Sequence, residues 1–261
     1  MNFSHIKSLL TGFVAVAAAA FLSGCATMSV RPRTIVVWSE GTVEVGIYPV
    51  DINGAIVEGL KADPRFANDN IVRASLQQPD QGIPDELLNK ADVLIWWGHK
   101  KHGLVSDELT AKIKQRWQDG KMGFIGLHSA HFSKPNKAIL GTPCSFAAYK
   151  CDITKTEFTV TDKTHPIAAG LPEKFTIASG ERYSDPYLVP EGYKSMFDGL
   201  STMRDGKTEN AKMGYAWDNL GKSRVFYLQA GHETDPIFCD PNIRRIIGNA
   251  TEWVMPRPEQ K

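Results

Sequence analysis

Short apolar runs bounded by glycine or polar residues recur along the chain, and they predict its strands. The runs are Thr34–Glu40, Ile71–Leu76, Ala91–Gly98, Met122–Leu127 and Arg224–Gln229. Runs of this length, apolar on both faces, are typical of buried parallel strands. We therefore expect one parallel sheet that is covered on both sides.

Segments with helical patterns alternate with these runs. The best-marked helix begins after Ser106, a favourable N-cap residue, and ends before Gly120. Ala55–Ala62 and Asp85–Lys90 predict shorter helices, and Asn242–Val254 predicts a final one with a single apolar face. This alternation indicates an α/β fold with a doubly wound parallel sheet.

The middle of the chain, Cys144–Asn219, is less regular. Candidate strands at Glu157–Thr161, Lys174–Ala178 and Lys212–Trp217 are separated by turn-forming residues. We expect this segment to form an irregular antiparallel insertion, as an extension of the sheet or as a lid near its edge. No linker or internal repeat divides the chain, so one domain over residues 34–256 is predicted.

The first 25 residues have the pattern of an export signal. Lys7 precedes an apolar stretch at Leu9–Phe21, and Leu22-Ser23-Gly24-Cys25 resembles a bacterial lipobox. The prediction is a lipoprotein signal peptide at 1–25, lipidation at Cys25 and a short tether at 26–33. Ala26 then favours the periplasmic face of the outer membrane of a Gram-negative bacterium. An ordinary secretory peptide that is cleaved elsewhere is the alternative.

Composition narrows the range of partners. The 30 Lys and Arg nearly balance the 29 Asp and Glu, and no basic block is present, so nucleic acid is not an expected partner. A small ligand is expected instead. Cys144 and Cys151 could form a disulfide in an oxidising compartment, although free thiols are an equally good interpretation. No cysteine is predicted to be catalytic.

Five of the seven histidines follow three of the predicted strands. They are His99 and His102, His128 and His131, and His232, which Glu233 follows. Because parallel strands direct their carboxyl ends to one edge, these side chains are expected to converge in one crevice. The alternative is that each histidine is an ordinary polar residue at the start of a loop.

Imidazole nitrogens are common ligands of zinc and similar divalent ions, and a catalytic ion usually takes three protein ligands. The candidate ligands of such an ion are His99, His102, His128 and His232. The candidate catalytic groups are His128, His131, His232 and Glu233. Trp96 is expected in the core, whereas Trp97 could offer its ring face to a sugar. No nucleotide cofactor is expected.

The motifs that contain these residues also resemble a known family. They are Trp96-Trp97-Gly98-His99-x-x-His102, Leu127-His128-Ser129-x-His131-Phe132-Ser133-Lys134, Gly141-Thr142-x-Cys144, His165-Pro166-Ile167 and Gly231-His232-Glu233-Thr234. Their combination is similar to the ThuA-like (trehalose utilisation) family. The resemblance implies a flavodoxin-like sheet of the class I glutamine amidotransferase type. It also implies a role in the catabolism of trehalose-type glycosides or their 3-keto derivatives.

The resemblance implies further contacts with the substrate, and the chain also departs from the family pattern. Glu40, Lys134, Glu181, Tyr183 and Asp185 fall in matching motifs and become candidate substrate-binding residues. However, Asp185 replaces a longer carboxylate of the family pattern. Asn53 also stands where the family usually has a histidine. Both changes bear on which substrate is bound.

One catalytic activity of related folds is not expected. Amidotransferases carry a nucleophilic cysteine at a sharp elbow after a central strand. Here His128 occupies that position, so glutamine hydrolysis by this route is excluded, with Ser129 a remote substitute nucleophile. The leading hypothesis is a lyase, hydratase, hydrolase or isomerase acting on glycosides. The alternative is a non-catalytic sugar-binding lipoprotein, and the sequence leaves the sugar, the ion and the oligomeric state open.

Overall fold

A computed structural model describes residues 31–43, 46–178 and 180–257. The predicted signal peptide and Cys25 lie outside these residues. Among the described helices, none combines the length and the apolar composition that crossing a membrane requires. The described elements belong to the compact unit Pro32–Lys261.

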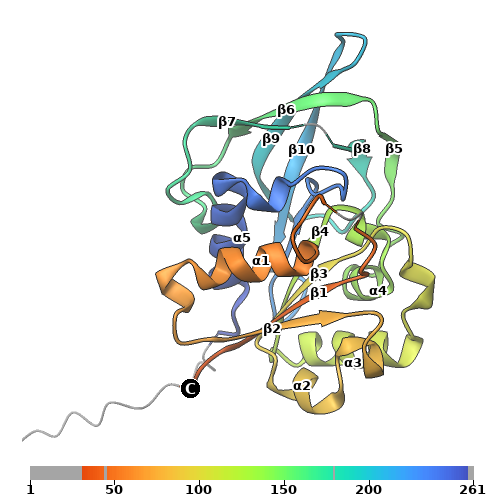
Figure 1. The fold of residues 1–261 in the computed structure, drawn as a ribbon, viewed down its shortest axis with the longest axis vertical. Coiled ribbons are helices and arrows are strands. Elements are labelled where there is room, and N and C mark those ends of the chain that lie inside the picture. The colour runs from red at the N-terminus through yellow and green to blue at the C-terminus, as the bar shows by residue number, and fades with distance from the viewer. Residues whose placement is uncertain (1–30, 44–45, 179, 258–261) are drawn as a thin grey trace, which may run out of the picture. The chain divides into compact units, whose positions relative to one another are not determined.

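Five parallel strands form the centre of the sheet (Figure 1). They are β1 (Thr34–Ser39), β2 (Asn70–Ser75), β3 (Val93–Trp97), β4 (Gly123–Leu127) and β11 (Val225–Leu228). Their order is β2-β1-β3-β4-β11, which is the flavodoxin-like order of a doubly wound sheet. The parallel sheet predicted from the apolar runs is therefore confirmed.

Helices cover both faces of these strands (Figure 1). They are α1 (Ile52–Lys61), α2 (Asp85–Lys90), α3 (Asp107–Gln118), α4 (Lys134–Leu140) and α5 (Pro241–Val254). Apolar residues of α1 and α5 pack into one core, and those of α2, α3 and α4 pack into another. Ser106 caps α3 as predicted, because its Oγ accepts a hydrogen bond from the backbone N–H of Leu109.

Alternating side chains of β3 separate the two tryptophans. Trp96 pairs with Trp38 of β1 and stacks on its ring at 3.7 Å between centroids, on the α2 and α3 side. Trp97 belongs to the opposite core and is fully buried. Successive residues of a strand point to opposite faces, so the two adjacent rings fill different cores.

The irregular middle of the chain continues the sheet with antiparallel strands. These are β6 (Ile153–Val160), β7 (Lys174–Ala178), β9 (Lys194–Met203) and β10 (Thr208–Trp217), in the order β11-β10-β9-β6-β7. In the described part of the chain the sheet thus has nine strands. The predicted antiparallel extension is confirmed, although β9 was not predicted and β6 begins earlier than expected.

A separate two-stranded sheet packs beside β10 and was also not predicted. It pairs β5 (Phe146–Lys150) with β8 (Arg182–Tyr187) in antiparallel fashion. Phe146 stacks on Tyr187 at 4.1 Å between ring centroids, and it contacts the ring of His131 at 5.1 Å. Since His131 follows β4, this two-stranded sheet lies over the carboxyl edge of the parallel strands.

Candidate functional site

Three histidines meet where three parallel strands end. His99 lies two residues after β3, His128 directly after β4, and His232 in the loop after β11. Their ring centroids are 5.0 to 5.3 Å apart. The convergence expected for these three residues is therefore confirmed. His128 and His232 are buried, and the side chain of His99 keeps 17% of its surface exposed.

A sharp turn directs His128 into the cluster. The strand β4 ends at Leu127, and His128 has a φ of 55°, an uncommon value for a residue with a side chain. Gly231 lets the loop after β11 approach His128 closely, because a Cβ at this position would lie 3.3 Å from the Cβ of His128. The elbow predicted from the sequence thus holds an imidazole.

Glu233 is a buried carboxylate that is already paired. Its Oε2 contacts Nδ1 of His99, and its Oε1 lies 2.6 Å from the ammonium nitrogen of Lys100. Burial alone would raise the pKa of Glu233, but the contacts with His99 and Lys100 outweigh burial and lower it well below its ordinary value. Glu233 is therefore held as an anion behind the histidines.

A second carboxylate, Glu181, lies directly before β8 and enters the cluster from the side of the β5–β8 sheet. Its Oε2 lies 3.3 Å from Nε2 of His128 and accepts a 2.7 Å hydrogen bond from the hydroxyl of Tyr183. The Tyr183 hydroxyl is also 2.5 Å from Oγ of Ser129. Burial again opposes ionisation, yet the contacts with His128 and Tyr183 lower the pKa of Glu181 to about 2. Burial and Glu181 raise the pKa of Tyr183, which keeps its proton.

The Nδ1 atom of each histidine in the cluster has a partner of its own. Nδ1 of His128 lies 3.2 Å from the carbonyl oxygen of Gln229, and Nδ1 of His99 contacts Glu233. Nδ1 of His232 lies 2.7 Å from the hydroxyl of Thr234, which in turn donates to Asp235. Because a carbonyl oxygen and a carboxylate only accept, Nδ1 of His128 and Nδ1 of His99 carry the proton, as in histidines that bind metals through Nε2. Nδ1 of His232 instead accepts a hydrogen bond from the backbone N–H of Thr234 at 3.3 Å.

This donor set could hold a metal ion. Ligand atoms of His99, His128, His232 and Glu233 all lie within 4.8 Å of one another. Bonds of roughly 2.0–2.2 Å around a tetrahedral ion would place ligand atoms about 3.3–3.6 Å apart, so the side chains would need to move by about an ångström. Burial and the nearby His128 lower the pKa of His232, which favours the neutral form that a metal requires.

The other two predicted histidines lie beside this cluster. Nδ1 of His102 is 3.4 Å from the buried carboxylate of Glu40. The same carboxylate accepts hydrogen bonds from the backbone N–H groups of Lys100 and Lys101, so Glu40 holds the loop that carries His99. His131 is buried among aromatic rings, and burial lowers its pKa to about 3.

The remaining predicted residues are more widely spread. Trp97 lies in the core, where its indole N–H donates to the carbonyl oxygen of Gly231, so it supports the loop before His232. Lys134 forms an ion pair with Asp107 between α4 and α3. Asp185 accepts from the hydroxyl of Tyr215 at 3.0 Å. Their predicted contacts with a sugar remain predictions.

Several contacts in the site were not predicted. Lys100 was not recognised because an exposed lysine in a loop carries no pattern, and Gln229 and Thr234 act only by fixing ring nitrogens. Cys151 follows β5 and directs its Sγ to Oε1 of Glu181 at 3.6 Å. Cys144 and Cys151 are free thiols, one buried and one exposed.

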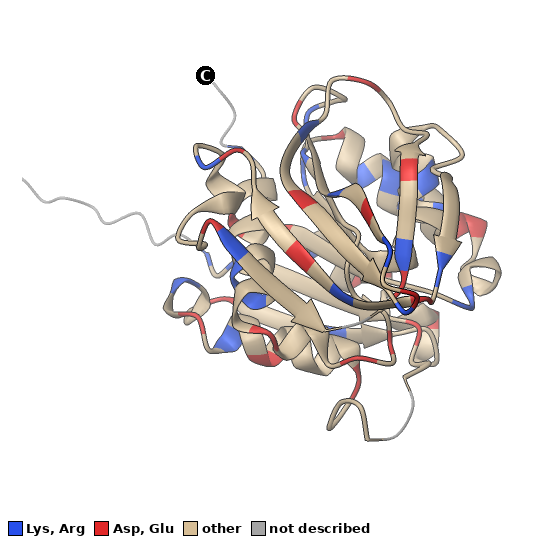
Figure 2. Cartoon of the chain, turned by 90° about the horizontal axis from the view of Figure 1, so that it is seen from above, with Lys and Arg blue, Asp and Glu red and all other residues tan. Residues whose placement is uncertain are grey.

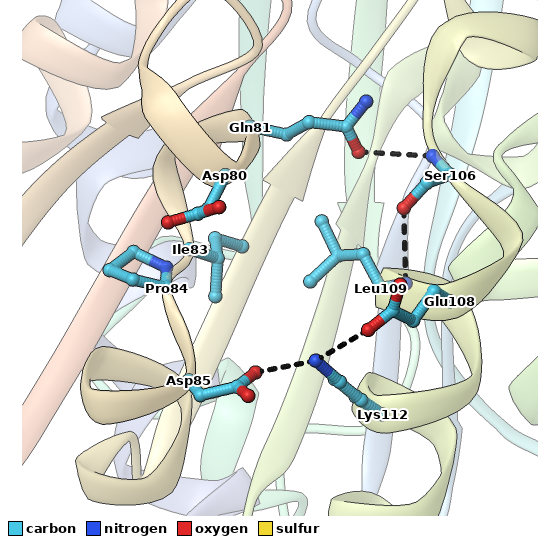
Figure 3. Close-up of a pocket in the computed structure, with 9 residues that line it drawn as sticks. All are labelled: Asp80, Gln81, Ile83, Pro84, Asp85, Ser106, Glu108, Leu109 and Lys112. Carbon is cyan, nitrogen blue, oxygen red and sulfur yellow. Dashed lines mark hydrogen bonds and ion pairs between the residues drawn. The ribbon is translucent and has the colours of Figure 1, made fainter.

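A groove of about 480 Å³ lies elsewhere, between η2 (Pro79–Gly82), α2 and the start of α3 (Figure 3). Lys112 crosses it and pairs with Asp85 and Glu108 on the surface. None of the cluster histidines lines this groove. Lys112 pairs with two of its three carboxylates, and the groove has no counterpart of the histidine cluster, so we place the functional site at the histidines. Across the chain as well, charges of both signs are interspersed (Figure 2).

These features define the class of the protein. It is a flavodoxin-like α/β protein with a cluster of histidines and carboxylates at the carboxyl edge of its parallel strands. The chain belongs to the trehalose utilisation (ThuA) family, whose model matches residues 35–254. The family assignment made from the motifs is confirmed.

Solved structures share the fold. A ThuA-like protein from Bacteroides uniformis is 16% identical, with 88% of this chain and 94% of that chain covered and a TM-score of 0.58. A ThuA-like protein from Parabacteroides merdae is 12% identical, with coverage of 86% and 90% and a TM-score of 0.61. A cytoplasmic protein from Salmonella typhimurium is 9% identical, with coverage of 85% and 99% and a TM-score of 0.58. A search of curated proteins gives no match.

Proposed function

We propose that the protein is an enzyme of sugar catabolism that acts on trehalose-type glycosides or their 3-keto derivatives at the histidine cluster. The observation that carries this proposal is the meeting of His99, His128 and His232 with Glu181 and Glu233. Membership of the trehalose utilisation family supports the class of substrate. The reaction is a lyase, hydratase, hydrolase or isomerase step on the glycoside.

We further propose that the cluster holds a divalent ion, zinc or a similar metal. His99, His128 and His232 would be its ligands, with Glu233 holding His99 in position. Such an ion would polarise a sugar carbonyl or a bound water. Three histidine ligands leave a position open for substrate.

The chain's own groups would then move the proton. Glu181 is ionised at neutral pH and lies beside His128, so it can accept a proton from the sugar, although its lowered pKa makes it a weaker base than an ordinary carboxylate. The hydroxyl of Tyr183 orients this carboxylate by its 2.7 Å hydrogen bond. Glu233 is a less suitable base, because Lys100 and His99 already occupy its oxygens.

The test is turnover of 3-keto-trehalose by the purified protein. Activity is measured before chelation, after removal of metal, and after addition of zinc, with His165→Asn as a control for a histidine change outside the cluster. His165 caps η5 (Pro166–Ala168) and packs on Trp253, and asparagine keeps a capping acceptor. Turnover that is lost with the chelator and restored by zinc supports the proposal. Binding of the sugar without turnover in any state contradicts it and favours a non-catalytic sugar-binding protein.

The place of action is a separate proposal. We propose that the protein is exported, lipidated at Cys25 and held at the periplasmic face of the outer membrane. The support is the Leu22-Ser23-Gly24-Cys25 string followed by Ala26. A small carbohydrate and the membrane would then be its partners.

A further inference from the structure

Tyr149 is a large aromatic side chain that remains exposed on the two-stranded β5–β8 sheet. It is 64% exposed, whereas Tyr183 and Tyr187 on the facing strand are buried. An exposed aromatic ring beside a polar cluster is a common element of sites that bind small ligands. Its position relative to the cluster decides whether it has such a role.

The strand register places Tyr149 on the face that carries the cluster residues. Tyr149 is the direct antiparallel partner of Tyr183. Directly opposed residues project from the same face, with Cβ atoms about 4.5–5.5 Å apart. The hydroxyl of Tyr183 reaches Glu181 at 2.7 Å, so this face is the one turned to the histidines.

A second contact supports the same placement. Cys151 lies two residues after Tyr149, and its Sγ is 3.6 Å from Oε1 of Glu181. Residues two apart along an extended segment share a face. Cys151 is itself exposed, so residues 149–151 border the cluster on its solvent side.

Trp97, the ring that the sequence suggested for contact with a sugar, lacks the exposure of Tyr149. Trp97 is fully buried and donates its N–H to Gly231. A sugar ring has an apolar C–H face and polar edges, and an exposed tyrosine presents a flat apolar surface to such a face. Tyr149 offers this surface next to the catalytic groups.

We propose that Tyr149 forms the aromatic wall of a second sugar subsite, in which it stacks against the ring that is not transformed. The site then takes a disaccharide-sized glycoside and not a single sugar. This inference rests on the proposed function, since it places the reacting ring at the histidine cluster. Tyr149 would contribute to binding and selectivity, and not to the chemical step.

The test compares wild type, Tyr149→Ala, Tyr149→Phe and Leu188→Ala. Leu188 is a matched control because it is 53% exposed and directly follows β8. Calorimetry measures binding of trehalose and of glucose to each protein. The apolar area of one ring face is worth about a tenfold change in affinity. We expect Tyr149→Ala to bind trehalose about tenfold more weakly with little change for glucose, and Tyr149→Phe and Leu188→Ala to match wild type.

Thiol labelling supplies a second measurement that needs no turnover. Trehalose should slow the alkylation of Cys151 by iodoacetamide, while Cys239, which is also exposed, reacts at an unchanged rate. If wild type binds trehalose only as tightly as Tyr149→Ala does, and trehalose does not slow the alkylation of Cys151, the subsite is overturned. The proposed function is then unaffected. Wild type that binds no trehalose and turns over no keto-glycoside overturns both.

Discussion

Replacing Gly231 by alanine tests how the loop after β11 positions the cluster. Gly231 has a φ of +137°, and an added Cβ would lie 2.6 Å from the ring of Phe238 and 3.3 Å from the Cβ of His128. The backbone strain costs about 1–3 kcal/mol, and relief of the clash about 1–3 kcal/mol more. We therefore expect the free energy of unfolding to fall by about 2–6 kcal/mol, and His128 to be displaced.

Gly206→Ala is the matched control. Gly206 also has a positive φ, +84°, but nothing lies within 4 Å of an added Cβ, so this variant reports backbone strain alone. Urea denaturation gives the free energy of unfolding of both variants, and calorimetry gives their affinity for zinc. If the two variants lose the same stability and Gly231→Ala keeps the zinc affinity of wild type, Gly231 does not position the cluster.

Burial lowers the pKa of His165, so below about pH 6.5 the unfolded chain takes up a proton that the folded chain does not, and the protein loses stability as the pH falls. His165→Asn should lose less free energy of unfolding than wild type between about pH 7.5 and 5 in urea denaturation; equal losses contradict this. Glu181→Gln should lower kcat at least about a hundredfold with KM little changed, whereas the surface variant Glu157→Gln should not; steady-state kinetics that show equal kcat values exclude Glu181 as the base. Cys25→Ser should abolish lipidation without unfolding the domain. Mass spectrometry that finds a lipid-free N-terminal peptide in wild type would contradict the anchoring proposal.

The parallel half of the fold could be predicted because its strands are uniformly apolar. The runs at β1, β3 and β4 are buried on both faces, and Ser106 marks the start of α3. The strands β8 and β9 gave no such signal. The first contains Pro186, and the second includes Asp198 and Gly199, so neither reads as a clear alternation.

The difference between the uniformly apolar parallel strands and the other strands also explains which site residues could be predicted. His99, His128 and His232 follow predicted strands, so the topology alone brings them together. Glu181 and Tyr183 reach them only because the two-stranded β5–β8 sheet folds over this edge, and they were identified from family motifs. The burial of Trp97 could not be predicted in the same way. The run Val93–Trp97 is apolar throughout, so the sequence does not show which core each side chain enters.

The most direct test of the central proposal is the kcat/KM of His128→Ala on 3-keto-trehalose. His128 touches Glu181 and lies within 5.3 Å of the other two rings, so its loss removes a group that the reaction would need. We expect a decrease of at least about a hundredfold, on the order of 3 kcal/mol of transition-state stabilisation, in a variant that stays folded. A folded His128→Ala protein with the kcat/KM of wild type would contradict the assignment of the histidine cluster as the catalytic site.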